Sequence, residues 1–478
     1  MRPSSSPSDR PDSSDVGLFD SLLAAGGVRA AVDDHAWIRA MLDVQAALAR
    51  AQARIGAVPA DAAAAITAAC REHRFDPVVI GAEATAAGNP VVPLVAALRR
   101  AVGTSAASHV HAGATSQDIL DSATMLVAGR ALEPLRQDIN RAAAAAARLA
   151  HAHADTLMPA RTLLQQALPT TFGLVAAGWL VALDATAGRL ATIRDRVLAV
   201  QLGGAAGTLA AFGPDGLRLV QLVATELGLT APTLPWHTDR TRIAELAGAL
   251  GSTAGSTAKI ARDVTLYTQT EVGELAEGRP GGSSTLPHKR NPIAAITALA
   301  CASQAPGLVA TLLASMAQEH QRAAGAWHAE WRALRALLES TGSAAYWLRT
   351  CLDEVRVNAV RMRTNLDLTG GVLLAEQVTG ALVERLGRHQ AHEIVRRAAD
   401  DGHDGDRHDG DRHDDDEPAG SFGLADRLAA DPQVNAVLSR ADIDRLLDPA
   451  GYLGAHRELI DRALRAHHGR LLTEGSTD

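Results

Sequence analysis

Residues 250–275 read LGSTAGSTAKIARDVTLYTQTEVGEL, and their apolar side chains recur at the spacing of one helical face. This stripe consists of Leu250, Ala254, Ala258, Ala261, Val264, Val272 and Leu275. A second stripe consists of Leu180, Leu183, Ala187, Leu190 and Val197. Strand-like alternation is missing between about 115 and 365, so we predict long helices packed side by side in a bundle.

The composition favours the same fold class. The chain has 478 residues, of which 47% are hydrophobic and only 3% are aromatic. Alanine and leucine both favour helices and pack closely between them. We therefore expect an all-α protein whose core is built from small and aliphatic side chains.

Charge and cysteine content exclude several classes of protein. The formal net charge of −8 argues against a nucleic-acid partner, because phosphate binding favours a basic surface. Cys70, Cys301 and Cys351 are far apart and odd in number, which indicates reduced thiols in a cytoplasmic protein. No run of about 18 apolar residues is free of polar interruption, so we expect no transmembrane helix and no membrane partner.

Changes in composition divide the chain into parts. Residues 1–17 are rich in Ser, Pro and Asp and predict a disordered tail without a signal peptide. We expect an N-terminal helical domain over 18–112, a central bundle over 113–365 and a C-terminal helical domain over 366–478. Residues 400–420, DDGHDGDRHDGDRHDDDEPAG, predict a solvated acidic insertion. We expect no functional metal there, because metal sites need a defined geometry.

Four polar segments stand out from the apolar background, at 109–118, 161–166, 236–242 and 281–292. The last reads GGSSTLPHKRNP, and it places hydroxyl, cationic and amide groups on a glycine-containing loop between two helices. Such a loop can close over an anion. Each segment alone is also compatible with helix caps and turns, since Ser, Thr and Asn cap helices and Pro starts them.

Together, the order and residue types of these segments resemble the fumarase/aspartase superfamily. Residues 282–291, GSSTLPHKRN, are similar to its signature GSSxMPxKxN, with leucine in place of methionine. A Thr-Ser-x-Asp segment at 115–118 and an Arg-Thr-x-x-Gln segment at 161–165 add to the likeness, which covers roughly residues 35–395. Further segments resemble the bacterial 3-carboxymuconate cycloisomerases: GNPVVPL at 88–94, LQQALP at 164–169, QLGGAAGT at 201–208 and GAWHAEW at 325–331.

The resemblance implies an architecture and a chemistry. Members have three helical domains, and their central bundles assemble into a homotetramer with a twenty-helix core. Three subunits contribute to each active site, so the polar segments need not meet within one chain. The substrate is a small carboxylic acid, here a tricarboxylate, and neither a metal nor another cofactor takes part.

The resemblance also implies roles for individual residues. Ser283 would transfer the proton, while Lys289 and Asn291 would hold the carboxylate on which negative charge develops. The other carboxylates would be bound by residues from all four segments: His111, Thr115, Ser116, Gln165, Arg161, Arg242, Ser284 and Arg290. Arg240 is a further candidate. For each arginine, a structural ion pair is an equal alternative.

Two departures from the superfamily pattern narrow the reaction. Superfamily lyases place a catalytic histidine where this chain has Leu163, and fumarase-type members place its orienting glutamate where it has Ile296. That pair protonates a leaving amine or hydroxide. In a cycloisomerase the departing group is the substrate's own carboxylate, whose pKa is about 4, so no acid is needed. The resemblance therefore implies an isomerase that closes 3-carboxy-cis,cis-muconate to 4-carboxymuconolactone in protocatechuate catabolism.

Three other interpretations remain open at this stage. One is a superfamily lyase that releases fumarate from adenylosuccinate or argininosuccinate. Another is a helical scaffold that has lost activity, although the retained Ser283, Lys289 and Asn291 argue against it. The third is a metal hydrolase built on the His109/His111 or His151/His153 pair, which is disfavoured because side chains at i and i+2 of a helix diverge.

Overall fold

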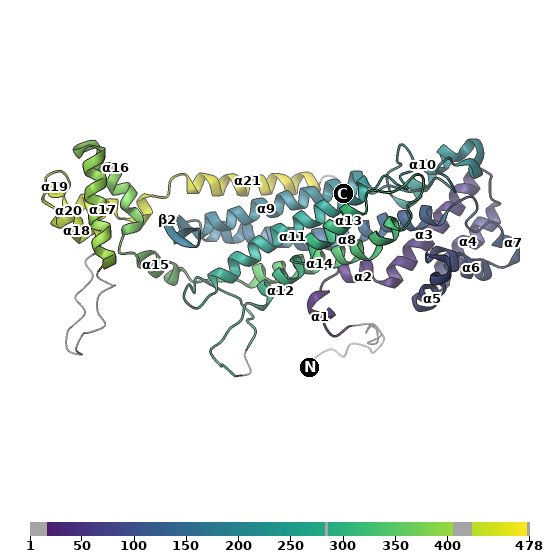
Figure 1. The fold of residues 1–478 in the computed structure, drawn as a ribbon, viewed down its shortest axis with the longest axis horizontal. Helices are drawn as coiled ribbons and strands as arrows, with labels where there is room; N and C mark the ends of the chain where they lie inside the picture. The colour runs from purple at the N-terminus through teal and green to yellow at the C-terminus, as the bar shows by residue number, and fades with distance from the viewer. Residues whose placement is uncertain (1–16, 283–284, 405–422, 476–478) are drawn as a thin grey trace. The chain divides into compact units, whose positions relative to one another are not determined.

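The computed structural model describes residues 17–282, 285–404 and 423–475 (Figure 1). Helices make up most of this part of the chain, and the strands form two small antiparallel pairs. The predicted all-α fold class is confirmed. The predicted disordered tail, apart from Gly17, lies outside the described residues, as do Ser283 and Ser284.

The chain divides into two compact units. The first comprises Met1–Ala142, Leu183–Asp263 and Ile293–Asp353, and the second comprises Ala143–Ala182, Val264–Pro292 and Glu354–Asp478. Four long helices have residues in both units: α8 (Ser116–Ala152), α9 (Phe172–Thr192), α11 (Thr241–Tyr267) and α14 (Ala326–Glu354). The predicted three-domain division stays a prediction.

The remaining elements of the first unit are helical. They are α1 (Asp20–Leu23), α2 (Val28–Val32), α3 (Asp34–Arg54), α4 (Ala60–Glu72), α5 (Pro77–Ala87), α6 (Val91–Val102), α7 (Thr104–Ala107), the π-helix η2 (Ile193–Val197), the 3-10 helix η3 (Ala210–Asp215), α10 (Gly216–Leu227), α12 (Ile293–Ala302) and α13 (Ala305–Ala314). Their ends follow local sequence signals. Asp33 and Asp76 cap α3 and α5, and Gly88 ends α5 in the left-handed conformation.

The second unit combines short strands with the C-terminal helices. Its elements are β1 (Leu157–Thr162), β2 (Gln165–Thr171), β3 (Leu275–Ala276), β4 (Arg356–Val357), α15 (Ala359–Asp367), η4 (Val372–Leu374), α16 (Ala375–Leu386), α17 (Arg388–Asp404), α18 (Leu424–Ala430), α19 (Pro432–Asn435), α20 (Arg440–Leu446), η5 (Pro449–Gly451) and α21 (His456–Gly475). The C-terminal helices share a core that includes Val378, Leu382, Ile394, Leu428 and Ile443. Because α17 continues to Asp404, the first residues of the expected acidic insertion are helical, and 405–420 lies outside the described residues.

The two predicted apolar stripes agree with the structure to different extents. Leu180, Leu183, Ala187 and Leu190 are all fully buried, which confirms their stripe as a core face. The other stripe is correct only as far as Val264, because α11 ends at Tyr267 and Leu275 lies in strand β3 instead. Gly273 adopts a positive φ of 60° between them, a conformation that interrupts any helix.

One local prediction was wrong. Residues 157–171, expected to lack strands, form the hairpin β1–β2 with Pro159 opposite Pro169. Proline is disfavoured in helix interiors, and the β-branched Thr170 and Thr171 favour extended backbone. These residues form a local strand signal within a region whose apolar stripes indicate helices.

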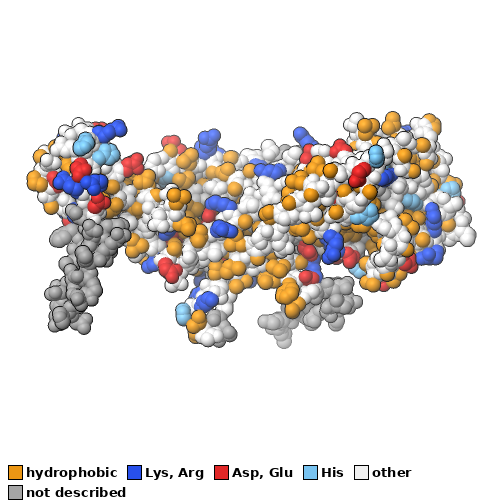
Figure 2. Space-filling model, viewed as in Figure 1, with side chains coloured by type: hydrophobic (Ala, Val, Ile, Leu, Met, Phe, Trp, Pro, Cys, Tyr) orange, Lys and Arg blue, Asp and Glu red, His pale blue; other side chains and the backbone are white. Residues whose placement is uncertain are grey.

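Two helical stretches in the described part of the chain are long and apolar enough to cross a membrane, in contrast to the expectation from uninterrupted apolar runs. They are Phe172–Val197 and Ile293–Ala314, and only 44% and 39% of their most apolar windows are buried within the chain. Val181, Ile293 and Leu313 are among the exposed large hydrophobic residues. Figure 2 shows that hydrophobic side chains are also common on the visible face of the molecule.

Candidate active site

The start of α8 is held by a buried carboxylate. Asp118 is fully buried and accepts hydrogen bonds from the backbone N–H groups of Thr115 (3.0 Å), Gly203 and Gly204 (both 2.9 Å) and from Nε2 of His237 (2.7 Å). A Cβ atom on Gly203 would lie 2.6 Å from the His237 ring, so glycine is required there. Asp118 therefore fixes the Thr-Ser-x-Asp segment against two other segments of the same unit.

A second buried network lies one helical turn further along α8. The guanidinium of Arg240 is 2.8 Å from Asp121 and 2.6 Å from Glu330, and all three side chains are at most 3% exposed. Trp327 Nε1 donates to Asp121, and Gln318 Nε2 donates to Glu330. Burial alone would lower the pKa of Arg240, but the two carboxylates outweigh burial and raise it. For Arg240, the structure supports the ion-pair alternative.

Arg322 is a cation that the sequence analysis did not single out. Its Nη1 donates to Oε1 of Gln117 (3.1 Å) and its Nη2 to the carbonyl of Gly204 (2.6 Å). Burial lowers the pKa of Arg322, and Asp118 and Asp121 partly counteract this. Arg322 thus holds a positive charge beside the Thr-Ser-x-Asp segment. The only sequence signal was the polar stretch between α13 and α14, which matches no motif.

His111 is preorganised as a neutral donor. Its backbone has a positive φ of 64°, and its Nδ1 lies 2.9 Å from Nε2 of Gln45. Burial lowers the pKa of His111 to about 4, with a smaller raising effect from Asp118. The ring is therefore neutral at pH 7. Since the Gln45 amide donates to Nδ1, the ring proton lies on Nε2, where it can be donated to an oxyanion.

The signature loop is closed at its base. Gly281 and Asn291 exchange two backbone hydrogen bonds of 2.9 Å, so the loop leaves and re-enters the fold at one point. Lys289 and Arg290 are exposed, and Asn291 is partly buried at the base. The catalytic and binding roles predicted for Ser283 and Ser284 fall outside the described residues.

The hairpin β1–β2 carries the Arg-Thr-x-x-Gln segment. Arg161 forms a bidentate ion pair with the fully buried Glu274 at 2.7 and 2.8 Å, and Asn365 donates to the same carboxylate. Leu163 and Leu164 form the tip, both with positive φ, and they are 96% and 72% exposed. Gln165 beside them is exposed as well.

The structure places the predicted site residues in two groups. His111, Thr115 and Ser116 lie in the first unit with Arg322, whereas the hairpin and the signature loop belong to the second. Arg242 also lies in the first unit, where its Nη1 donates to the carbonyl of Val197 (2.8 Å) and caps η2. Within the described residues, no group of three or more His, Cys, Asp or Glu side chains is arranged to hold a metal ion.

The chain matches known families over most of its length. A family model described as Lyase matches residues 21–307, and one described as Adenylosuccinate lyase C-terminus matches residues 371–463. The chain belongs to the fumarase/aspartase superfamily. The predicted membership is thereby confirmed, and this superfamily member is an enzyme.

Three similar proteins match this chain over nearly its whole length. A 3-carboxy-cis,cis-muconate cycloisomerase of Pseudomonas aeruginosa is 46% identical over 462 residues, which span 94% of this chain and 96% of the relative. A nitrosuccinate lyase of Streptomyces davaonensis is 44% identical over 465 residues, 94% of each chain. The crystal structure of the 3-carboxy-cis,cis-muconate lactonizing enzyme from Pseudomonas putida has a TM-score of 0.87 and 41% identity, over 95% of this chain and 99% of that one.

Proposed function

We propose that this enzyme is a 3-carboxy-cis,cis-muconate cycloisomerase that forms 4-carboxymuconolactone. The observation that carries the proposal is the 46% identity to cycloisomerases from two bacteria over 94% of the chain. The solved lactonizing enzyme, with its TM-score of 0.87, supports it further. The reaction is an intramolecular addition, so the enzyme is an isomerase.

In the proposed reaction, a carboxylate oxygen of the substrate adds to a carbon–carbon double bond. The new C–O bond forms as the π bond breaks, and the electron pair moves to the carbon beside another carboxylate. Lys289 and Asn291 of the signature loop would stabilise the resulting enediolate. Ser283 would then deliver a proton to that carbon. Because Lys289 is exposed in the structure, we infer that the loop encloses the substrate before the proton moves.

The first unit would bind the substrate's remaining carboxylates. The N-terminus of the 37-residue helix α8 places the positive end of the helix dipole next to Thr115 and Ser116. Neutral His111 would add an Nε2–H donor, and Arg322 would add a full positive charge. The buried Asp118 network holds these groups in place, so little ordering is required when the substrate binds.

The enzyme lacks the acid that other superfamily reactions use. The two replacing residues are apolar and exposed: Leu163 is 96% exposed at the hairpin tip, and Ile296 is 43% exposed on α12. A carboxylate is stable as an anion near neutral pH, so it can attack or leave without proton transfer. Loss of the histidine–glutamate pair is therefore compatible with lactone formation.

A second candidate function is elimination of nitrite from nitrosuccinate, which the 44% identical nitrosuccinate lyase favours. Nitrite is also a stable anion, so this reaction would likewise need no acid at the position of Leu163. The missing histidine argues against expulsion of an amine or hydroxide, but it does not separate these two candidates. A direct comparison of substrates is needed.

The deciding experiment is a panel of assays with the purified full-length enzyme. We expect rapid loss of ultraviolet absorbance with 3-carboxy-cis,cis-muconate and no fumarate or nitrite from nitrosuccinate. Adenylosuccinate and argininosuccinate serve as amine-releasing controls and should yield no fumarate. Faster turnover of nitrosuccinate than of the muconate would overturn the proposal in favour of the second candidate.

We propose further that the enzyme is a cytoplasmic homotetramer with shared active sites. The exposed leucines of the hairpin tip and the half-covered apolar helices support this, because other subunits would bury them. The three buried thiols suit a reducing compartment. Light scattering should give four chains per particle. Mixed and reassembled Ser283→Ala and Gln165→Ala enzymes should regain activity, whereas sites built within one chain would leave the mixture inactive.

A further inference from the structure

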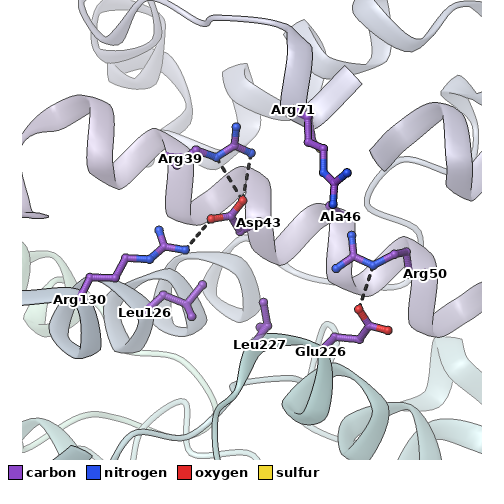
Figure 3. Close-up of a pocket in the computed structure, with 10 residues that line it drawn as sticks. Arg39, Asp43, Ala46, Arg50, Arg71, Leu126, Arg130, Glu226 and Leu227 are labelled. Atoms are coloured by element: carbon purple, nitrogen blue, oxygen red, sulfur yellow. Dashed lines mark hydrogen bonds and ion pairs between the residues drawn. The ribbon is translucent and has the colours of Figure 1, made fainter. Parts of the chain in front are cut away.

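A pocket of about 240 Å3 in the first unit is lined by four arginines. Arg39 and Arg50 come from α3, Arg71 from the end of α4 and Arg130 from α8. Figure 3 shows Arg39 and Arg130 on either side of Asp43, and Arg71 extending toward Arg50. These arginines belong to none of the segments that carry the proposed reaction.

The pocket contains more positive than negative charge. Asp43 pairs with Arg39 (3.0 Å) and Arg130 (2.6 Å), and Glu226 pairs with Arg50 (2.8 Å). Four arginines and two carboxylates leave the lining with a formal charge of +2, in a chain whose formal net charge is −8.

Neighbouring groups do not offset this excess. Arg54, just outside the lining, also approaches Glu226, at 3.7 Å. Cys70 lines the pocket, but burial raises the pKa of its thiol to about 12, so it carries no charge at neutral pH. Arg71 makes no ion pair with any residue that the structure describes. Arg71 is exposed, and its side chain extends toward Arg50, which is already paired with Glu226.

The pocket lies away from the Thr-Ser-x-Asp segment. Leu126 and Arg130 line it, and they follow Ser116 by ten and fourteen residues along the continuous helix α8. At about 1.5 Å per residue, the separation along the axis is roughly 15–21 Å. A small ligand cannot span that distance.

A purely structural network that ties α3 to α8 and α10 would need only as many arginines as carboxylates. The surplus cations, with Arg71 unpaired at the open side, are what a multiply charged anion requires. We propose that this pocket is a second anion site for a compact oxyanion with at least two negative charges, bearing phosphate or carboxylate groups. Arg71 is its main ligand, and Arg39, Arg50 and Arg130 supply further N–H donors.

The test is titration calorimetry on the full-length enzyme, with inorganic phosphate in one arm and tricarballylate in the other. Arg71→Gln removes the unpaired cation and leaves both ion-paired carboxylates intact. Arg218→Gln is the matched control, since it removes the same charge from an arginine that is 65% exposed on α10 and outside the pocket. We expect Arg71→Gln to weaken one binding event at least about tenfold, the scale of a lost charge-assisted hydrogen bond.

The same event should be unchanged in Arg218→Gln, and turnover without added anion should be normal in both variants. Loss in the phosphate arm alone identifies a phosphate site, and loss in the tricarballylate arm alone identifies a carboxylate site. If neither anion binds the wild-type enzyme, or if Arg71→Gln and Arg218→Gln bind both anions equally, the proposal is overturned. Because the readout is binding away from the reaction, its failure would leave the proposed function untouched.

Discussion

The two regions proposed to form the active site differ in how they are supported. Around Asp118, the side chains of Gln117 and His237 are buried, and the carboxylate accepts hydrogen bonds from the N–H groups of Gly203 and Gly204. Gly203 has no room for a Cβ atom. In the signature loop and at the hairpin tip, Lys289 and Leu163 project from short chain segments into solvent. One region is largely buried within the fold, and the other is exposed.

This difference has an energetic basis. Buried charges are tolerated only when they are paired and hydrogen-bonded, so the Asp118 and Arg240 networks must be rigid to exist at all. Exposed groups have no such requirement and remain free to meet a substrate or a second subunit. We infer that the first region holds the substrate-binding groups in a fixed arrangement, while the second supplies the hydroxyl that transfers the proton.

The largest expected effect comes from breaking the rigid region. Arg240→Met would leave Asp121 and Glu330 buried without their cation, and we expect a loss of about 3–5 kcal/mol in the free energy of unfolding. Urea denaturation followed by circular dichroism measures it. Arg218→Met, at an exposed pair with Asp215, should change the same quantity by less than about 0.5 kcal/mol. Equal losses in the two variants would contradict a special role for the buried network.

In the exposed region, the expected effect is on rate and not on stability. Ser283→Ala should lower turnover of 3-carboxy-cis,cis-muconate by more than about a hundredfold, the lower scale for losing a general acid or base. The unfolding midpoint should be unchanged. Ser303→Ala, which removes an exposed hydroxyl on the surface, is the control and should be fully active. A near-normal rate for Ser283→Ala would remove serine from the mechanism.

The neutral state of His111 makes the rigid region sensitive to acid. The pKa of His111 is lowered to about 4 in the folded chain, so between pH 6.5 and 4 the unfolded chain binds the extra proton. The contribution of neutral His111 to the free energy of unfolding is therefore fully present above about pH 6.5. It decreases as the pH falls, by about 2 kcal/mol between pH 7 and 5.

Asparagine is the suitable substitution here, because it tolerates the left-handed backbone of His111. The His111→Asn enzyme should lose about 2 kcal/mol less than the wild type over the same pH interval, as measured by urea denaturation at each pH. The exposed His73, changed to Asn, should leave the wild-type pH dependence intact. An unaltered profile in His111→Asn would contradict the lowered pKa, because it would mean that His111 binds its proton equally well in the folded and unfolded chains.

The smallest effect should appear where the rigid region meets the substrate. Arg322→Gln keeps a donor toward Gln117 but removes the charge, and we expect KM to rise about tenfold with little change in the free energy of unfolding. Steady-state kinetics measures KM and kcat separately. Arg189→Gln on the exposed face of α9 provides the charge-matched control. If kcat fell while KM stayed constant, Arg322 would instead act on the transition state.

The sequence predicted the helical class and the superfamily because long stripes and a ten-residue motif are local patterns. It did not predict the partners of charged side chains, which depend on residues far apart in the chain. For Arg161 and Arg240, the sequence left a substrate ligand and a structural ion pair as equal alternatives, and the carboxylates of Glu274, Asp121 and Glu330 that bind them become visible only in the structure. Arg322 was not predicted for the same reason, since it belongs to no motif and its role depends on its contact with Gln117. His237 lies in the polar segment 236–242, but its hydrogen bond to Asp118 could not be predicted from sequence.

The closed base of the signature loop has a consequence for engineering the loop. With Gly281 and Asn291 bonded to each other, the residues between them form a cassette whose length and chemistry can change without shifting the register of α11 or α12. Swapping cassettes between relatives is a practical route to engineered variants.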